Sequence, residues 1–300
     1  MKQQILILLL VLVVAGCAPA PTPAPTLTPP VFPTPAIRMG GKVVYLPGVR
    51  VADFQWQRTG YGRPYGAIGK DPELHNRGMW AYSWGVGDCM DIPMVFSDNE
   101  MPSLTGLQRC GQVSNVLLAF NEPEWASQAN MTPEVAAKTL RYLESVWPGE
   151  LYCCGNIISH AGWFDRMMAA YKAAYGGTPR LAGTHVHIYV GDGLPDVANP
   201  TDGKWLARNM ADLQRYLEVM RKWQIPPKLI VSECCLLGKH SEGTYLAVQD
   251  LYMPWLRSVR EIQSVAWFSA RYAGFPDANM LKAGGGLTVV GQNWLDWRWK

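Results

Sequence analysis

Carboxylates stand directly after two apolar runs of the chain. In "LLAFNEPEW" an apolar stretch leads into Asn121, Glu122 and Glu124, and in "KLIVSECC" a second stretch leads into Glu233. Where parallel strands end at one rim, such residues converge on the same cavity. Two converging carboxylates are what a retaining glycosidase needs, because one protonates the leaving oxygen while the other attacks the anomeric carbon. Glu122 and Glu233 are therefore the candidate catalytic residues.

A second group of polar side chains lies in "THVHIYV". Strict alternation along a strand puts His185, His187 and Tyr189 on one face. Since this strand comes between the two carboxylate-bearing strands in chain order, we expect the three side chains to face the same cavity. His185 is the deepest of them and is expected to be a hydrogen-bonded core residue.

A metal site is the alternative use of these residues. His185, His187, Glu233 and Cys235 all offer atoms that Zn²⁺ accepts as ligands. The sequence has no compact Cys/His signature, however, and alternation sends Cys234 and Cys235 to opposite sides of their strand. We therefore expect neither a metal nor another cofactor.

Aromatic residues are abundant, with 13 tryptophans and 13 tyrosines in 300 residues. Flat rings pack well on the C–H faces of sugars, although most aromatic residues build cores. Trp84 and Trp267, in or at the end of expected strands, are the candidate platforms inside a cleft. Trp125 and Trp163 follow two other strands and are expected to extend it. Together they favour a polysaccharide or oligosaccharide groove over a small-molecule pocket.

Eight short segments are expected to be the strands that position these side chains: residues 66–68, 78–84, 91–96, 116–121, 151–155, 183–189, 229–233 and 264–268. Amphipathic segments of helical spacing alternate with them, the clearest over 136–147, 206–220 and 245–259. Eight such units in roughly 260 residues predict an α/β fold, a (β/α)₈ TIM barrel with a single catalytic domain. An open doubly wound sheet is the alternative, but it would need a glycine-rich phosphate loop, which "GAIGKDPELHNRG" does not supply.

The first residues have the pattern of an export signal. Lys2 precedes an uninterrupted apolar run over residues 5–15, which is too short to span a bilayer. The run ends in "VAGC", which resembles the lipobox of bacterial lipoproteins, in which the cysteine carries lipid. We expect a signal peptide over 1–17, lipid on Cys17 and an exported protein anchored to a membrane, with an ordinary cleaved signal as the alternative.

Composition separates the rest of the chain into a linker and one domain. Residues 18–40 are rich in Pro, Thr and Ala, so they are expected to form a disordered linker, of which residues 18–36 reach about 60 Å when extended. Residues 41–300 are expected to form the glycoside hydrolase domain, since 17% charged and 48% hydrophobic residues suit a compact core. A net charge of +3 with no basic run indicates no nucleic-acid partner, and we expect a monomer.

Six cysteines remain besides Cys17, and an exported protein can pair them. Cys89 and Cys110 precede neighbouring expected strands and are a possible disulfide. The adjacent pairs at 153–154 and 234–235 lie on strands, where neighbouring side chains point apart. They are expected to be buried thiols that do not form disulfides.

Several motifs together resemble one enzyme family. "FNEPEWASQANMTPEVAA", with "WAYSWG", "DIPMVFSD", "HVHIY", "LIVSECC" and "VAWFSARY" in that order, looks like the clan A glycoside hydrolases, and most like glycoside hydrolase family 128. That family consists largely of β-1,3-glucan-cleaving enzymes. The likeness covers residues 65–293, and its most specific part is 120–137.

The resemblance implies a role for each candidate. Glu122 would be the general acid/base and Glu233 the nucleophile, so Glu122 should carry a raised pKa while Glu233 is ionised. Asn121 would contact the sugar hydroxyl next to the reacting carbon, a bond that can strengthen in the transition state. His187 and Tyr189 would line the sugar site, with Tyr189 donating to the nucleophile.

The chain also departs from the family pattern. Glu124 replaces the usual Asp and is interpreted as a rim or helix-entry carboxylate, while Phe96 lies near the usual aromatic platform of the third strand. These changes leave open another β-glycan, such as xylan or mannan, or a tethered carbohydrate-binding lipoprotein without turnover. Because Glu122 and Glu233 are both present, we expect an O-glycosyl hydrolase, with β-1,3-glucan as the first substrate to test.

Overall fold

The computed structural model describes residues 36–39, 42–45, 59–63, 73–74, 79–86, 89, 91–194 and 197–297. Residues 34–300 form one compact unit. Its first described element is an antiparallel pair, β1 (Ala36–Met39) and β2 (Lys42–Tyr45). In the described part of the chain, no helix has the length and apolar character needed to cross a bilayer.

The remaining strands all pair in parallel, as expected for βα units. They are β3 (Thr59–Arg63), β4 (Trp80–Ser83), β5 (Met94–Val95), β6 (Val116–Ala119), β7 (Glu150–Cys153), β8 (Asn156–Ile157), β9 (Thr184–Tyr189), β10 (Leu229–Cys235) and β11 (Ile262–Trp267). One sheet has the order β4-β3-β11-β10-β9-β8 and the other the order β5-β6-β7.

Two isolated parallel bridges link these sheets in the order of an eight-stranded barrel. Tyr82 bridges to Ile92 between β4 and β5, and Tyr152 bridges to Gly183 between β7 and the start of β9. β8 follows β7 after two residues, so both belong to the fifth barrel position. The predicted (β/α)₈ architecture is therefore confirmed, and the carboxyl ends of the strands meet at one rim.

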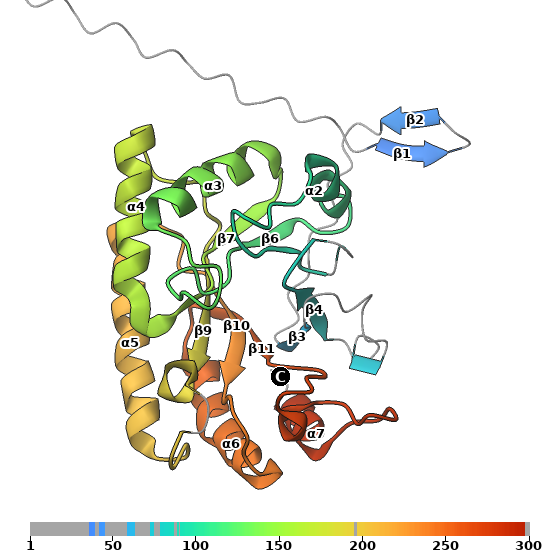
Figure 1. Ribbon diagram of the computed structural model, residues 1–300, viewed down its shortest axis with the longest axis vertical. Helices are drawn as coiled ribbons and strands as arrows, with labels where there is room; N and C mark the ends of the chain where they lie inside the picture. The colour runs from blue at the N-terminus through green and yellow to red at the C-terminus, as the bar shows by residue number, and fades with distance from the viewer. Residues whose placement is uncertain are drawn as a thin grey trace, which may run out of the picture. The chain divides into compact units, whose positions relative to one another are not determined.

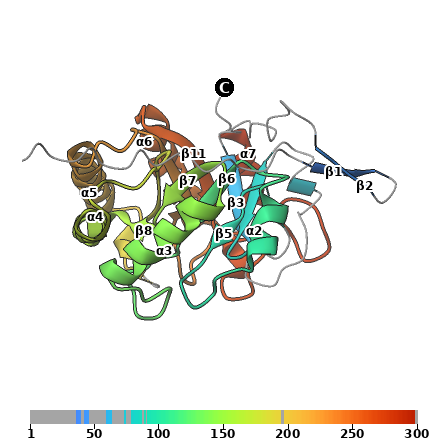
Figure 2. The ribbon, with the colours of Figure 1, turned by 90° about the horizontal axis from the view of Figure 1, so that it is seen from above.

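Helices lie outside the strands (Figures 1 and 2). They are α2 (Leu104–Cys110), α3 (Pro133–Val146), α4 (Ala161–Tyr175), α5 (Gly203–Lys222), α6 (Glu242–Ser258) and α7 (Val289–Asp296), with short 3₁₀ turns η1 (Ile158–His160), η2 (Val190–Gly193) and η3 (Pro276–Ala278). The Thr132 hydroxyl caps α3 by accepting from the Val135 amide, and Pro133 is the first helical residue. Apolar spacing thus predicted α3, α5 and α6 correctly.

The core has two parts, as a barrel requires. One cluster fills the inside of the strands: Trp80, Tyr82, Ile92, Met94, Val116, Leu118, Tyr152, Ile230 and Ala266. A larger cluster fills the space between strands and helices, with Leu117 and Ala119 contributing from β6. Because β6 is buried on both faces, its sequence is apolar without alternation.

The first barrel strand is not where the sequence predicted it. Residues 66–68 lie outside the described residues, and β3, which is earlier in the chain, pairs with both β11 and β4. Its sequence, "TGYGR", has two glycines and one arginine, so it lacks the apolar run used to recognise the other strands.

Cysteine pairing differs from the expectation at two places. Cys89 and Cys110 form a disulfide between the segment after β4 and the end of α2. The pairs Cys153–Cys154 and Cys234–Cys235 also form disulfides, so the prediction of separate buried thiols is wrong. The peptide bond within each pair is cis.

Candidate active site

Glu122 lies just beyond the end of β6 and points into the strand rim. Phe120 and Glu122 both have positive φ, at 72° and 44°, a conformation that non-glycine residues adopt mainly in turns and functional sites. The Glu122 amide donates to the Gly155 carbonyl at 3.0 Å, and the Trp125 amide donates to the Glu122 carbonyl at 3.0 Å. The backbone is thus held on both sides of a carboxylate that is only 5% exposed.

Glu124 secures the same loop to the next strand. Its carboxylate accepts from the Asn156 side chain at 2.7 Å and from the Ile157 amide at 2.8 Å, and it lies 3.4 Å from Nδ1 of His160. The interpretation of Glu124 as a rim carboxylate agrees with this position. Its contacts join the loop that carries Glu122 to β8 and η1.

Glu233, in β10, is surrounded by donors. Its Oε1 accepts from the Tyr82 hydroxyl at 3.1 Å and from Nε1 of Trp84 at 2.9 Å. Its Oε2 accepts from the Tyr189 hydroxyl at 2.5 Å. Three donors therefore fix the position of this carboxylate.

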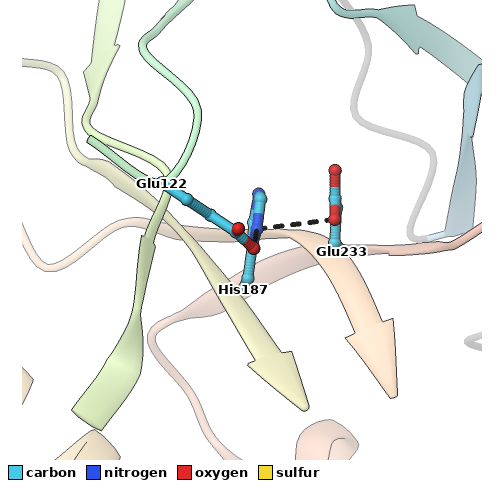
Figure 3. A group of neighbouring side chains, drawn as sticks. All are labelled: Glu122, His187 and Glu233. Atoms are coloured by element: carbon cyan, nitrogen blue, oxygen red, sulfur yellow. Dashed lines mark hydrogen bonds and ion pairs between the residues drawn. The ribbon is translucent and has the colours of Figure 1, made fainter. Parts of the chain in front are cut away.

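His187, in β9, lies between the two carboxylates (Figure 3). Its Nδ1 is 2.8 Å from Oε1 of Glu122 and 3.5 Å from Oε2 of Glu233. Oxygens of Glu122 and Glu233 lie within 4.8 Å of each other. The imidazole therefore connects the two groups that the sequence predicted to converge.

Burial and neighbouring groups act in opposite directions on the pKa values of Glu122 and His187. Burial raises the pKa of Glu122, the charges of Glu233 and Glu124 add to this effect, and the contact with His187 opposes it. Burial alone would lower the pKa of His187, but the charge of Glu233 and the bond to Glu122 outweigh it and raise that pKa. Glu122 therefore keeps its proton to higher pH than an ordinary glutamic acid does.

The two tyrosines around Glu233 remain neutral donors. Burial, together with the negative charge of Glu233, raises the pKa of Tyr82 and of Tyr189 well above the ordinary tyrosine value. Both hydroxyls consequently keep the proton that they donate to the Glu233 carboxylate.

His185 lies in the core, where the sequence predicted a hydrogen-bonded histidine. Its Nε2 lies 2.8 Å from the Ala119 carbonyl oxygen, and its Nδ1 lies 3.0 Å from the Ser232 hydroxyl. Burial lowers the pKa of His185 to about 3, which leaves the ring neutral. Both ring nitrogens are engaged, so His185 does not join His187 in a ligand set.

Glu122, His187 and Glu233 are the described residues whose donor atoms come close enough to surround a metal ion. Nδ1 of His187 already bonds Glu122, and both oxygens of Glu233 accept hydrogen bonds. Because these atoms are already used in hydrogen bonds, the three residues suit proton transfer and charge stabilisation better than metal binding, which needs free lone pairs. Cys235, the remaining member of the alternative zinc set, is bonded to Cys234.

Asn121 and Trp84 lie at the rim as the sequence predicted. The Asn121 side chain is buried and donates to Gln128 at 3.3 Å, while its Oδ1 has no partner among the described residues. Trp84 is half-buried and donates to the candidate nucleophile. Trp125 is half-buried on the Glu122 side, with its ring edge-on to His160 at 6.4 Å between centroids.

Two predicted sugar platforms are wrong. Trp267 is fully buried, donates to the Ala278 carbonyl at 2.8 Å and packs on Trp294. Trp163 lies in α4, is 6% exposed and donates to the Met131 carbonyl at 3.3 Å. Both rings pack between strands and helices, because their backbone positions direct them away from the rim.

Tyr82 was missed as a functional residue. It precedes Trp84 by two residues on the strand, so alternation places the two side chains on one face and could have identified it. The sequence also did not identify Phe268, whose ring packs on Trp84 at 5.4 Å between centroids, because the adjacent Trp267 has the residue type more typical of a sugar platform.

Solved structures that share this fold include glycoside hydrolases of family 128. An endo-β-1,3-glucanase from Amycolatopsis mediterranei, solved with laminaritriose, has a TM-score of 0.62 at 22% identity over 80% of this chain and 99% of its own. An endo-β-1,3-glucanase from Pseudomonas viridiflava gives 0.61 at 22% identity over 81% and 98%. A curdlan-specific exo-β-1,3-glucanase from Blastomyces gilchristii gives 0.58 at 20% identity over 79% and 97%.

The sequence itself also matches a known family. No curated protein sequence matches the chain. The profile of the glycosyl hydrolase catalytic core matches residues 70–294, which include every strand from β4 to β11 and both candidate carboxylates. The chain therefore belongs to the glycosyl hydrolase catalytic core family.

Proposed function

We propose that this protein is a retaining glycoside hydrolase that cleaves β-1,3-glucan, with Glu122 as acid/base and Glu233 as nucleophile. The observation that carries the proposal is that two buried carboxylates, with oxygens within 4.8 Å of each other, have different surroundings. Glu122 contacts His187, whereas Glu233 accepts three hydrogen bonds. Retaining enzymes hold their carboxyl groups about 5–5.5 Å apart, whereas inverting enzymes leave about 6.5–9.5 Å for a water molecule. The short separation supports retention.

The first step would form a covalent glycosyl-enzyme. The Glu233 carboxylate attacks the anomeric carbon as the glycosidic C–O bond breaks, and Glu122 gives its proton to the departing oxygen. Tyr82, Trp84 and Tyr189 hold the Glu233 carboxylate in place for this attack. The elevated pKa of Glu122 supports its role as the acid.

The second step would release the sugar. Glu122, now ionised, takes a proton from water as the water oxygen attacks the anomeric carbon, and the bond to Glu233 breaks. His187 contacts both carboxylates and can stabilise the negative charge as it moves from Glu233 to Glu122. Asn121 supports sugar binding, because its buried Oδ1 can accept from a hydroxyl.

β-1,3-Glucan is the favoured substrate because the fold neighbours are β-1,3-glucanases, two of them endo-acting and one exo-acting. Xylan and mannan remain the alternative substrates. A sugar-binding protein without turnover would have no use for two carboxylates in opposed environments, so the geometry favours catalysis.

Release of reducing ends tests the proposal. The purified protein is incubated with β-1,3-glucan, β-1,4-glucan, xylan and mannan beside its Glu233→Gln variant, which keeps the shape of the side chain. We expect release from β-1,3-glucan by the parent alone, with activity reduced at least about 1,000-fold in the variant. Binding of a glycan by the parent without any release would favour the tethered binding protein.

We also propose that the enzyme works at a membrane surface. The lipobox cysteine, Cys17, and the Pro-rich residues that follow support an exported lipoprotein whose domain is held away from the bilayer. Glu122, His187 and Glu233 come from one chain, so a monomer is sufficient to complete the site.

A further inference from the structure

One short segment supplies three polar groups to the Glu124 carboxylate. The segment is "NIISH", residues 156–160, in which β8 leads directly into the 3₁₀ turn η1. Its first two residues donate a side-chain amide and a backbone amide to Glu124, and Nδ1 of His160 lies 3.4 Å from Oε1 of the same carboxylate. A 3₁₀ turn repeats every three residues, so His160 returns to the side of Ile157. The Glu124 side chain is thereby enclosed and only 4% exposed.

His160 is the base that faces this carboxylate. Its Nδ1 is buried and makes no hydrogen bond within the described residues, so its contact with Glu124 becomes an ion pair when the ring is protonated. The ring is held edge-on to Trp125, at 6.4 Å between centroids. The contact with Glu124 outweighs burial and raises the pKa of His160. Because the side chain is 41% exposed, the imidazole can exchange its proton with solvent.

Two further carboxylates act on His160, and each has an arginine partner. Asp192 in η2 bonds Arg208, and Asp212 in α5 lies 3.7 Å from Nε of the same arginine. Their negative charges contribute to the raised pKa of His160 after the larger effect of Glu124. Among the described residues, His160 is the base at ion-pair distance from Glu124. Its protonation therefore changes this pair from negative to neutral.

Glu124 comes two residues after the proposed acid and acts on it through space. Burial is the main cause of the raised pKa of Glu122; the contact with His187 opposes it, and the negative charges of Glu233 and Glu124 raise it further. A cation beside Glu124 cancels part of that negative charge. The protonation of His160 can thus change the proton affinity of Glu122 without any contact between the two side chains.

We propose that His160 is a positioning residue that acts through Glu124: its protonated imidazole neutralises the Glu124 carboxylate, and its neutral imidazole leaves that carboxylate to hold the proton on Glu122. This inference rests on the proposed function, in which Glu122 is the acid. The proton of His160 goes to solvent and none passes to Glu122, so the coupling is electrostatic. As the pH rises, loss of the proton from His160 extends the range in which Glu122 keeps its own.

The pH dependence of kcat/KM on a hexamer of β-1,3-linked glucose tests this coupling. His160→Asn places an amide near the position of Nδ1, so it keeps a neutral donor and removes the charge. We expect its alkaline limb to move to higher pH by about 0.5 unit, since Glu124 is then unopposed, and that of Glu124→Gln to move to lower pH by about as much. In the Glu124→Gln background, adding His160→Asn should shift the limb by less than about 0.2 unit.

His240→Asn is the matched control, because this histidine contacts the Leu237 carbonyl outside the site, and its limb should match the parent. His160→Gln, a second neutral replacement, should move the limb in the same direction as His160→Asn. An unmoved limb in both His160 variants would overturn the proposal, even with lower activity at every pH, because a structural role alone gives that result. An equal shift with and without the Glu124 carboxylate would overturn it too.

A parent that cleaves no β-glycan would overturn the proposed function instead. In that case the carboxyl carbon of Glu122 is titrated by nuclear magnetic resonance in the parent and in His160→Asn, which requires no turnover. A higher pKa of Glu122 in His160→Asn supports the coupling, and an equal pKa overturns it.

Discussion

Glu122 and Glu233 are the same residue type in different surroundings. Glu122 bonds one imidazole and is otherwise buried, and its pKa is raised chiefly by that burial. Glu233 accepts from two tyrosines and one tryptophan. This difference supports the proposed roles, with Glu122 as the proton donor and Glu233 as the nucleophile of a double displacement.

Replacing His187 with Asn tests how the proton of Glu122 is held. Activity requires protonated Glu122 and is lost as the pH rises through its pKa. The contact with His187 lowers that pKa, so removing the imidazole should move the alkaline limb of kcat/KM to higher pH. The pH profile of His240→Asn, a histidine that contacts the Leu237 carbonyl outside the site, should match the parent. A limb that moves to lower pH in His187→Asn contradicts this account.

Tyr189→Phe tests the support of the nucleophile. The change removes the 2.5 Å hydrogen bond to Oε2 of Glu233 and keeps the ring. A hydrogen bond to a charged group is worth about 1.5–3 kcal/mol, so kcat/KM should fall by about 10-fold or more. Tyr152→Phe is the comparison, because this buried tyrosine bonds Glu150 and Gln263 instead. Equal activity in the two variants would remove Tyr189 from the mechanism.

Strand ends made the convergence of Glu122 and Glu233 predictable, since a carboxylate after an apolar run is a specific signal. Alternation did the same for His187 and Tyr189. The roles of the tryptophans were harder to predict, because residue type alone does not distinguish a tryptophan in the core from one that packs on a sugar. Trp267 is in the core while the adjacent Phe268 packs at the rim, and one residue of register decides between them.

At the scale of the elements, the join between β7 and β9 depends on a glycine. Gly183 bridges to Tyr152, and a side chain there would overlap the Lys228 carbonyl oxygen and the Tyr152 ring. Neighbouring backbone cannot move away as a flexible side chain would. Close approach of the strands therefore requires glycine at this position.

Gly183→Ala should consequently lower the free energy of unfolding by about 1–3 kcal/mol, the usual cost of overpacking. Gly177→Ala is the matched control, because no atom lies within 4 Å of a side chain at that position. Urea denaturation of both variants measures the difference. A urea midpoint for Gly183→Ala equal to that of Gly177→Ala would show that the strands can move apart there without a loss of stability.

Helices and most strands followed from periodicity, but the first strand did not. Packed helices such as α5 keep an apolar stripe, whereas "TGYGR" in β3 gives no period to recognise. Disulfides within adjacent cysteines were unpredictable for a similar reason. The rule that neighbours on a strand point apart excludes such pairs, and Cys153–Cys154 and Cys234–Cys235 do not follow it.

At the scale of the whole molecule, the proposed anchor and the barrel have separate roles. The barrel carries the site, and residues 18–58 lie between Cys17 and its first strand, β3. If Cys17 carries lipid, Cys17→Ser should move the protein from the membrane fraction to the soluble fraction and abolish incorporation of labelled palmitate. Its kcat/KM on soluble oligosaccharides should equal that of the parent. Retention of Cys17→Ser in the membrane fraction would contradict the anchor.

The stereochemistry of the first product tests the central claim most directly. Proton nuclear magnetic resonance of a freshly mixed reaction, with the hexamer of β-1,3-linked glucose as substrate, reports which anomer appears before mutarotation. Two buried carboxylates with oxygens within 4.8 Å predict double displacement, so the β-anomer should appear first. Initial release of the α-anomer would mean a single displacement by water and would contradict Glu233 as the nucleophile.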